Sequence, residues 1–276
     1  MSAPALPPWT PAQWDGSWLV IPDLHGHAAR LDAALKVAAK HPGARLAFLG
    51  DLIDDSPRRR LARKAKDAPG SPDDSRAIMQ TVRHLAEMGR AEVLLGNHEV
   101  MALATVLDDH RPLMDVWWRV GGREAAASYA WQGKGEAGKL ADDLRWLRER
   151  GRLWLTIGPP GAGVLLSHAT RPSLSRSLSG QDCADNLTPS AAQDDVVWFP
   201  LGLGSGYGSR LRSLPLLGDG LIASLHGHME TPDLWTLLDT QDMPAYQLDL
   251  HPAQRRLALM HVGDQGELTA QVVRVD

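Results

Sequence analysis

Five short apolar runs, each followed by side chains that can bind a metal, constrain the fold of this 276-residue chain most strongly. Runs of this length, bounded by Gly and polar residues, are typical of buried strands. The side chains that follow them are Asp23 and His25, Asp51 and Asp54, Asn97 and His98, His168, and His226 and His228. Open α/β sheets bind ligands at the carboxyl ends of their strands. We therefore expect five strands of one sheet to bring these groups to one edge.

The chemistry of these groups indicates a metal centre. A single Gly-Asp after a strand, such as Gly50-Asp51, is more often an ordinary turn. Carboxylate, amide and imidazole groups are the oxygen and nitrogen ligands that suit Mn, Fe or Zn. The recurrence of this one set of donors after five strands predicts a shared metal site.

The remaining pattern is typical of an α/β protein. Apolar residues at helical spacing over 30–40 predict a crossover helix and hence parallel pairing of the first two strands. Amphipathic helices are also predicted over 73–89, over 99–109 and up to about Gly151. The segments 246–250, 257–261 and 268–275 predict strands of a second, mainly antiparallel sheet. We expect a Pro-rich arm over 1–16 and a single domain over 17–276.

Composition narrows the possible partners and compartment. A net charge of -4 gives no general attraction to nucleic acid or to membrane surfaces. Cys183 is the single cysteine, which excludes an internal disulfide and fits a reducing compartment. The chain has no apolar stretch of about 20 residues and starts without a basic or apolar leader. These features predict a cytoplasmic protein with no membrane contact.

The ordered motifs resemble those of the calcineurin-like metallophosphoesterases. The closest resemblance is to the phosphoprotein-phosphatase type, which includes lambda phage phosphatase and bacterial diadenosine tetraphosphatases. It runs from about Trp18 to about Leu238 and rests on Asp23-Leu24-His25-Gly26, Gly50-Asp51-Leu52-Ile53-Asp54, Gly96-Asn97-His98-Glu99, Ser167-His168-Ala169 and Gly227-His228. The stretch from Trp117 to Gly122 is similar to a Trp–Gly-Gly segment of bacterial members. This resemblance implies a four-layer β-sandwich flanked by helices.

The resemblance also implies a role for each motif residue. Asp51 would bridge two divalent metal ions, Asp23 and His25 would complete the protein ligands of one ion, and Asn97, His168 and His228 would complete those of the other. A hydroxide bridging the metals would attack phosphorus. His98 would donate a proton to the leaving group, and Asp54 would hold His98 protonated. Manganese is the first expectation for the metal, with iron or zinc as alternatives.

Two departures from the family pattern concern the substrate phosphate. The arginine that usually follows the second motif is absent from Asp54-Asp55-Ser56, and Trp198 is followed by Phe199 where a second arginine is common. The predicted substitutes are Arg58, Arg59 or Arg60 on one side and Arg210 or Arg212 on the other. His226 is a further candidate for substrate contact, because alternate side chains of a strand face the same way.

Three hypotheses for function follow. The first is a dimetal phosphoesterase acting on phosphate monoesters, including phosphoserine or phosphothreonine of proteins. The second is hydrolysis of dinucleoside polyphosphates, with Trp131, Trp198 or Tyr207 stacking on the bases. The third is a binding module that keeps the fold without the chemistry. In the enzymatic hypotheses the partner is a phosphorylated protein, small ester or nucleotide, and neither nucleic acid nor an obligate protein partner is expected.

Overall fold

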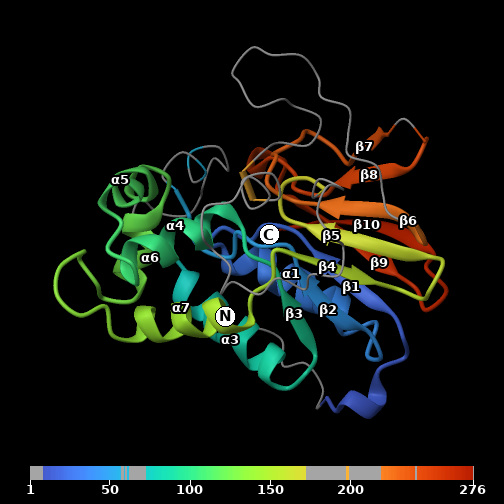
Figure 1. Ribbon diagram of the computed structural model, residues 1–276, viewed down its shortest axis with the longest axis horizontal. Helices are drawn as coiled ribbons and strands as arrows, with labels where there is room; N and C mark the ends of the chain where they lie inside the picture. Colours follow the sequence, from blue (N-terminus) through green and yellow to red (C-terminus); the bar gives the residue numbers. More distant parts are fainter. Residues whose placement is uncertain are drawn as a thin grey trace.

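Two five-stranded mixed sheets form the centre of the molecule (Figure 1). The computed structural model describes residues 9–56, 59, 61, 73–171, 197–198, 219–239 and 241–275. The first sheet has the order β10-β9-β1-β2-β3 and contains β1 (Trp18–Ile21), β2 (Arg45–Phe48), β3 (Ala91–Val93), β9 (Arg256–Val262) and β10 (Leu268–Arg274). The second has the order β4-β5-β6-β8-β7 and contains β4 (Trp154–Ile157), β5 (Gly163–Ser167), β6 (Leu221–His226), β7 (Trp235–Leu238) and β8 (Pro244–Gln247).

Residues of β1 alternate between two hydrophobic cores. Trp18 and Val20 pack between the sheets, together with Leu166 and Leu225 of the second sheet. Leu19 and Ile21 point the other way, into the core that the first sheet forms with the helices. Successive strand residues face opposite sides, so a strand covered on both faces is apolar throughout. This double burial explains why the motif strands appear in the sequence as uninterrupted apolar runs.

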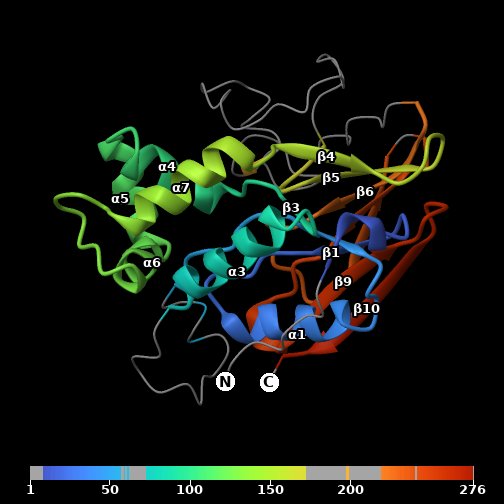
Figure 2. The ribbon, with the colours of Figure 1, turned by 90° about the horizontal axis from the view of Figure 1, so that it is seen from below.

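Helices cover the outer face of the first sheet and extend to one side of the molecule. They are α1 (Ala28–Ala38), α3 (Ser75–Glu87), α4 (Asn97–Val106), α5 (Arg111–Arg119), α6 (Gly122–Ser128) and α7 (Lys139–Arg150). Figure 2 shows α1 beneath the first sheet and the β4–β5 pair on the opposite side. The helices α4 to α7 all lie between β3 and β4 in the chain and gather beyond one end of the sheets (Figure 1). Short 3-10 helices occur at Pro11–Gln13 and Pro252–Gln254.

The structure confirms the α/β sandwich but corrects how the strands are divided between its sheets. The five motif strands do not share one sheet, because β1, β2 and β3 lie in the first and β5 and β6 in the second. The strands β9 and β10 are not in a separate antiparallel sheet, since β9 pairs antiparallel with β1. The strand β8 lies parallel to β6 and ends at Gln247, three residues earlier than predicted. An apolar pattern in the sequence indicates that a strand is buried, but it does not indicate which strand lies beside it.

Among the described residues, no helix has the length and apolar content needed to cross a membrane. Cys183 lies outside the described residues.

Candidate metal centre

Side chains from both sheets converge where the carboxyl ends of their central parallel strands meet. The Asn97 side-chain oxygen lies 3.1 Å from His168 Nε2 and 2.9 Å from His228 Nδ1. On the other side, His25 Nε2 lies 3.4 Å from Asp23 Oδ2. Five of the six residues for which metal binding was predicted thus form two sets, and two of these five, His168 and His228, belong to motifs of the second sheet.

Asp51 lies between these two sets of donors. Its Oδ1 atom is 3.4 Å from His168 Nε2, and its Oδ2 atom is 3.6 Å from His25 Nε2. Donor atoms of Asp51, His168 and His228 lie within 4.8 Å of one another, as do those of His25, Asp51 and His98. Each carboxylate oxygen of Asp51 thus faces a different potential metal position.

The backbone at this centre adopts conformations that are unusual for residues other than glycine. The φ angles of His25, Asp51, Asp54 and His228 are 48°, 47°, 76° and 70°. Such left-handed conformations cost about 1–3 kcal/mol each and occur mainly where the surrounding structure holds them in place. The Asp51 carbonyl oxygen, for example, accepts hydrogen bonds from both Leu24 N and His25 N. These backbone conformations direct the side chains of adjacent turns towards the metal centre.

One glycine is required for the close approach of two of these turns. Gly50 has a φ of 98°, and a Cβ atom there would collide with the backbone nitrogen of Gly96. The second and third motifs can therefore touch only without a side chain at position 50. This contact places Asp51 next to Asn97 and His98.

The orientation of the imidazoles fits metal binding. His168 Nδ1 lies 2.9 Å from the Leu49 carbonyl oxygen and donates its hydrogen there, so Nε2 is the ring nitrogen that faces Asp51 and Asn97. Neither ring nitrogen of buried His25 has a hydrogen-bond partner among the described residues. Buried polar atoms are rarely left without partners, so these nitrogens fit a role in binding a metal ion. The nitrogen and oxygen donor set suits a divalent transition-metal ion.

The electrostatics of the site favour a bound cation. Although burial opposes its ionisation, His168 and His98 hold the pKa of Asp51 well below its usual range. Burial and the charge of Arg59 lower the pKa of His25 well below its ordinary value, which keeps this imidazole neutral. Burial and His168 likewise lower the pKa of His228 to about 4. Burial opposes the charged form of His168, but the Asp51 carboxylate raises the pKa of His168 to about 10, so an ion that binds at this imidazole has to displace a proton.

A second group surrounds His98. Its Nδ1 atom lies 2.7 Å from Asp54 Oδ2, and the same oxygen accepts a 2.6 Å hydrogen bond from Trp117 Nε1. Burial would lower the pKa of His98, but the Asp51 and Asp54 carboxylates raise it above its ordinary value. Residues of α5 thus orient the acid–imidazole pair, a role for Trp117 that its sequence motif did not reveal.

Glu99 is another residue whose role emerges only from the structure. This fully buried carboxylate accepts hydrogen bonds from Asp51 N at 2.7 Å, Leu52 N at 2.8 Å and Gly96 N at 2.9 Å. It therefore fastens the turn after β2 to the start of α4. The sequence placed Glu99 within the third motif, but gave no sign that its partners would be backbone groups of a distant segment.

We expect Glu99→Gln to lower the free energy of unfolding by about 2–3 kcal/mol, because its amide group would face backbone donors that now bind a carboxylate. Urea denaturation of the metal-free protein measures this loss. Glu92→Gln is the control, since Glu92 pairs with Arg45 and Arg152 near the surface and its loss is expected to cost less than about 1 kcal/mol. Equal stability of the two variants would contradict the proposed fastening role.

Of the residues predicted to contact the substrate, the structure describes Arg59 and His226. Arg58 and Arg210 lie outside the described residues, as do Arg60 and Arg212. Arg59 is described, and its Nη1 atom lies 2.8 Å from Glu230 Oε1, two residues after His228. His226 is fully buried, with Nδ1 3.1 Å from Ser167 Oγ and Nε2 2.8 Å from Ser224 Oγ. A substrate would have to displace these serines to reach the His226 ring.

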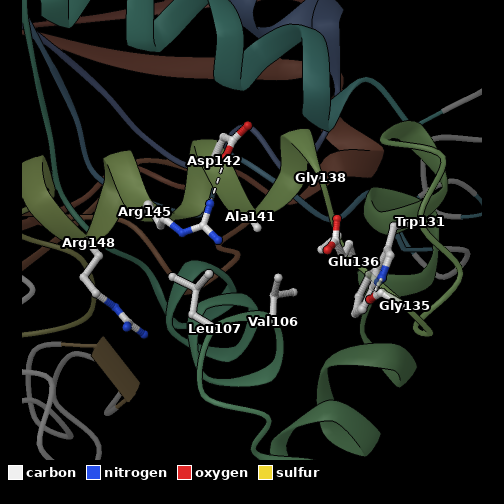
Figure 3. A pocket seen from close by; sticks show the side chains of 11 residues that line it. Val106, Leu107, Trp131, Gly135, Glu136, Gly138, Ala141, Asp142, Arg145 and Arg148 are labelled. Carbon is white, nitrogen blue, oxygen red and sulfur yellow. Dashed lines mark hydrogen bonds and ion pairs between the residues drawn. The ribbon is translucent and has the colours of Figure 1, made fainter.

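Of the three aromatic residues predicted to stack on nucleotide bases, Trp131 lies away from the metal centre. Trp131 lies in a separate hollow of about 680 Å³, shown in Figure 3, with Val106 and Leu107 at the end of α4. The centre lies at the opposite end of this ten-residue helix, about 15 Å away along its axis. Trp198 packs against the core beside the helices, and Tyr207 lies outside the described residues.

A family profile identifies the family of this chain. Among solved structures, the chain is similar to hypothetical protein PH1004 from Pyrococcus horikoshii OT3, with a TM-score of 0.49 and 13% identity over 94% of this chain and 88% of that chain. No curated protein matches the sequence. The profile described as calcineurin-like phosphoesterase matches residues 17–251, and this family uses dinuclear metal centres. The chain therefore belongs to the calcineurin-like phosphoesterase family and is a metal-dependent hydrolase of phosphoester bonds.

Proposed function

We propose that the protein is a dimetal phosphoesterase that hydrolyses phosphate monoesters. The observation that carries this proposal is the position of Asp51 between two sets of donors, with the His98–Asp54 pair beside it. We assign Asp51 as the bridging ligand, Asp23 and His25 to one ion, and Asn97, His168 and His228 to the other. When bound, the two ions supply positive charge for the phosphate oxygens and make a water molecule more acidic.

The chain itself supplies the proton for the departing alcohol. His98 is held through Nδ1 by Asp54, so its Nε2–H remains available to the leaving oxygen. The carboxylates around His98 favour its charged form, which is the form that can donate. Trp117 fixes the Asp54 oxygen that receives His98, and thereby keeps the imidazole in one orientation.

Arg59 is the described residue best placed to bind the substrate phosphate. Its ion pair with Glu230, two residues after His228, supports a position of the guanidinium group near the centre. Its present partner, Glu230, is a carboxylate that an incoming phosphate could replace. Arg59 would thus take the part of the arginine that is absent after Asp54.

We expect Arg59→Met to raise KM by about tenfold to a hundredfold, because a hydrogen bond to a charged group contributes about 1.5–3 kcal/mol. Glu230→Gln should lower KM, since it removes the group that competes with phosphate for Arg59. Arg83→Met is the control, because Arg83 makes comparable ion pairs with Glu87 and Asp143 among the helices. An unchanged KM in Arg59→Met would remove Arg59 from phosphate binding.

The substrate class is tested by assaying p-nitrophenyl phosphate, a phosphoserine peptide and diadenosine tetraphosphate in parallel, with Mn, Fe and Zn in turn. Preferred turnover of the monoesters supports the proposal. Faster hydrolysis of the dinucleotide would favour the alternative activity. A metal-loaded protein that hydrolyses none of these compounds would contradict a catalytic role.

A further inference from the structure

A carboxylate outside the family motifs lies against the metal centre. Asp249 is fully buried, and a carboxylate oxygen of Asp249 lies within 4.8 Å of donor atoms of both Asp23 and His25. These are the two residues that would hold one ion together with Asp51. The metal position beside Asp23 and His25 therefore has a third acidic group, Asp249, close to it, in addition to Asp23 and Asp51.

The two oxygens of Asp249 are in different situations. Oδ1 accepts a 2.8 Å hydrogen bond from Arg30 Nη2, a guanidinium group that is itself buried. Oδ2 is buried and has no hydrogen-bond partner among the described residues. Neither ring nitrogen of neighbouring His25 has one either. Unpaired acceptors on adjacent buried groups indicate a common cation.

The topology explains how Asp249 reaches the centre. Strands β6 and β8 are parallel neighbours, and His226 pairs with Gln247. His228 and Asp249 each lie two residues beyond that pair. The backbone of Asp249 is also joined to the turn after His228, because its carbonyl oxygen accepts a 3.0 Å hydrogen bond from Thr231 N. A sixth strand therefore delivers a donor to the same edge as the other five.

We propose that Asp249 is an additional acidic ligand of the ion held by Asp23 and His25, bound through Oδ2 directly or through one water molecule. This inference rests on the dimetal function proposed above. Arg30 acts as a positioning residue that fixes Oδ1 and turns Oδ2 towards the ion. The extra carboxylate makes this position selective for a small, oxygen-preferring divalent ion such as Mn²⁺.

The test is a calorimetric titration of metal-free protein with MnCl₂, comparing wild type with Asp249→Asn. The carbonyl oxygen of asparagine can keep the contact with Arg30, but its NH₂ group then faces the ion. We expect binding of one ion to weaken by about tenfold to a hundredfold, and binding of the other to stay unchanged. The thermal stabilisation by Mn²⁺ should fall in parallel. It is measured against each protein's own metal-free melting temperature, because the variant also leaves the buried Arg30 charge without its carboxylate.

Asp143→Asn is the matched control, because Asp143 is also buried and also binds an arginine, Arg83 at 3.1 Å. It should leave both binding constants unchanged. If Asp249→Asn does not fold, the double variant Arg30→Met/Asp249→Ala removes both buried charges and takes its place in the titration. Wild-type affinity for both ions in the folded variant would overturn the role of Asp249 alone. Failure of the wild type to bind two ions would instead overturn the dimetal function.

Discussion

Asp51→Asn is expected to reduce kcat by about a thousandfold or more. The substitution keeps the size of the side chain but removes the carboxylate charge that faces both sets of donors. A bound metal ion lowers the barrier by several kcal/mol, and each 1.36 kcal/mol corresponds to a tenfold change in rate. If Asp51 bridges the two ions, its loss should weaken the binding of both. Nearly all of the rate enhancement that the ions contribute should then be lost.

The same variant should lose the thermal stabilisation that Mn²⁺ gives to the wild type. Ligand present at a hundred times its Kd stabilises a protein by about 2.7 kcal/mol, so the shift in melting temperature reports ion binding independently of turnover. Asp143→Asn should retain both the shift and the activity. An Asp51→Asn protein that Mn²⁺ still stabilises to the wild-type extent would exclude Asp51 as the bridging ligand.

Much of this site could be predicted because its residues follow buried strands. A strand such as β1 or β2 is apolar on both faces, so the first polar side chains after it mark where the strand ends. Parallel strands have their carboxyl ends at the same edge, and thus the order of donors along the chain indicates a common site. The convergence of His168 with Asp51 required only this rule, together with a second sheet packed on the first.

The remaining features depend on contacts that local patterns do not encode. The segment from Tyr246 to Asp249 looked like part of an antiparallel strand, but β8 ends at Gln247 and runs parallel to β6, which makes Asp249 a strand-end donor. Trp117 is brought to Asp54 across 63 positions by the packing of α5. An apolar helix residue is normally a core residue, and nothing in its spacing shows that its Nε1–H will meet a carboxylate.

His98→Asn is expected to lower kcat by about a hundredfold to ten-thousandfold for an alkyl phosphate monoester, the range that general acid catalysis contributes. The loss should be much smaller for p-nitrophenyl phosphate, since p-nitrophenolate departs readily without a proton. Binding of Mn²⁺ should be unaffected, because this interpretation uses His98 for proton donation only. Single-turnover rates with both esters and a Mn²⁺ titration measure these effects.

The comparison of the two esters also decides between two roles that the geometry of His98 permits. Its Nε2 atom lies 3.8 Å from Asp51 Oδ2, and His98 can form a donor cluster with His25 and Asp51. A metal ligand at this position would lower turnover of both esters equally and weaken ion binding. A proton donor would discriminate between the leaving groups and spare the ions. Equal losses of kcat with both esters, together with weakened Mn²⁺ binding, would therefore show that His98 is a metal ligand. The proton donor to the departing alcohol would then have to be another residue.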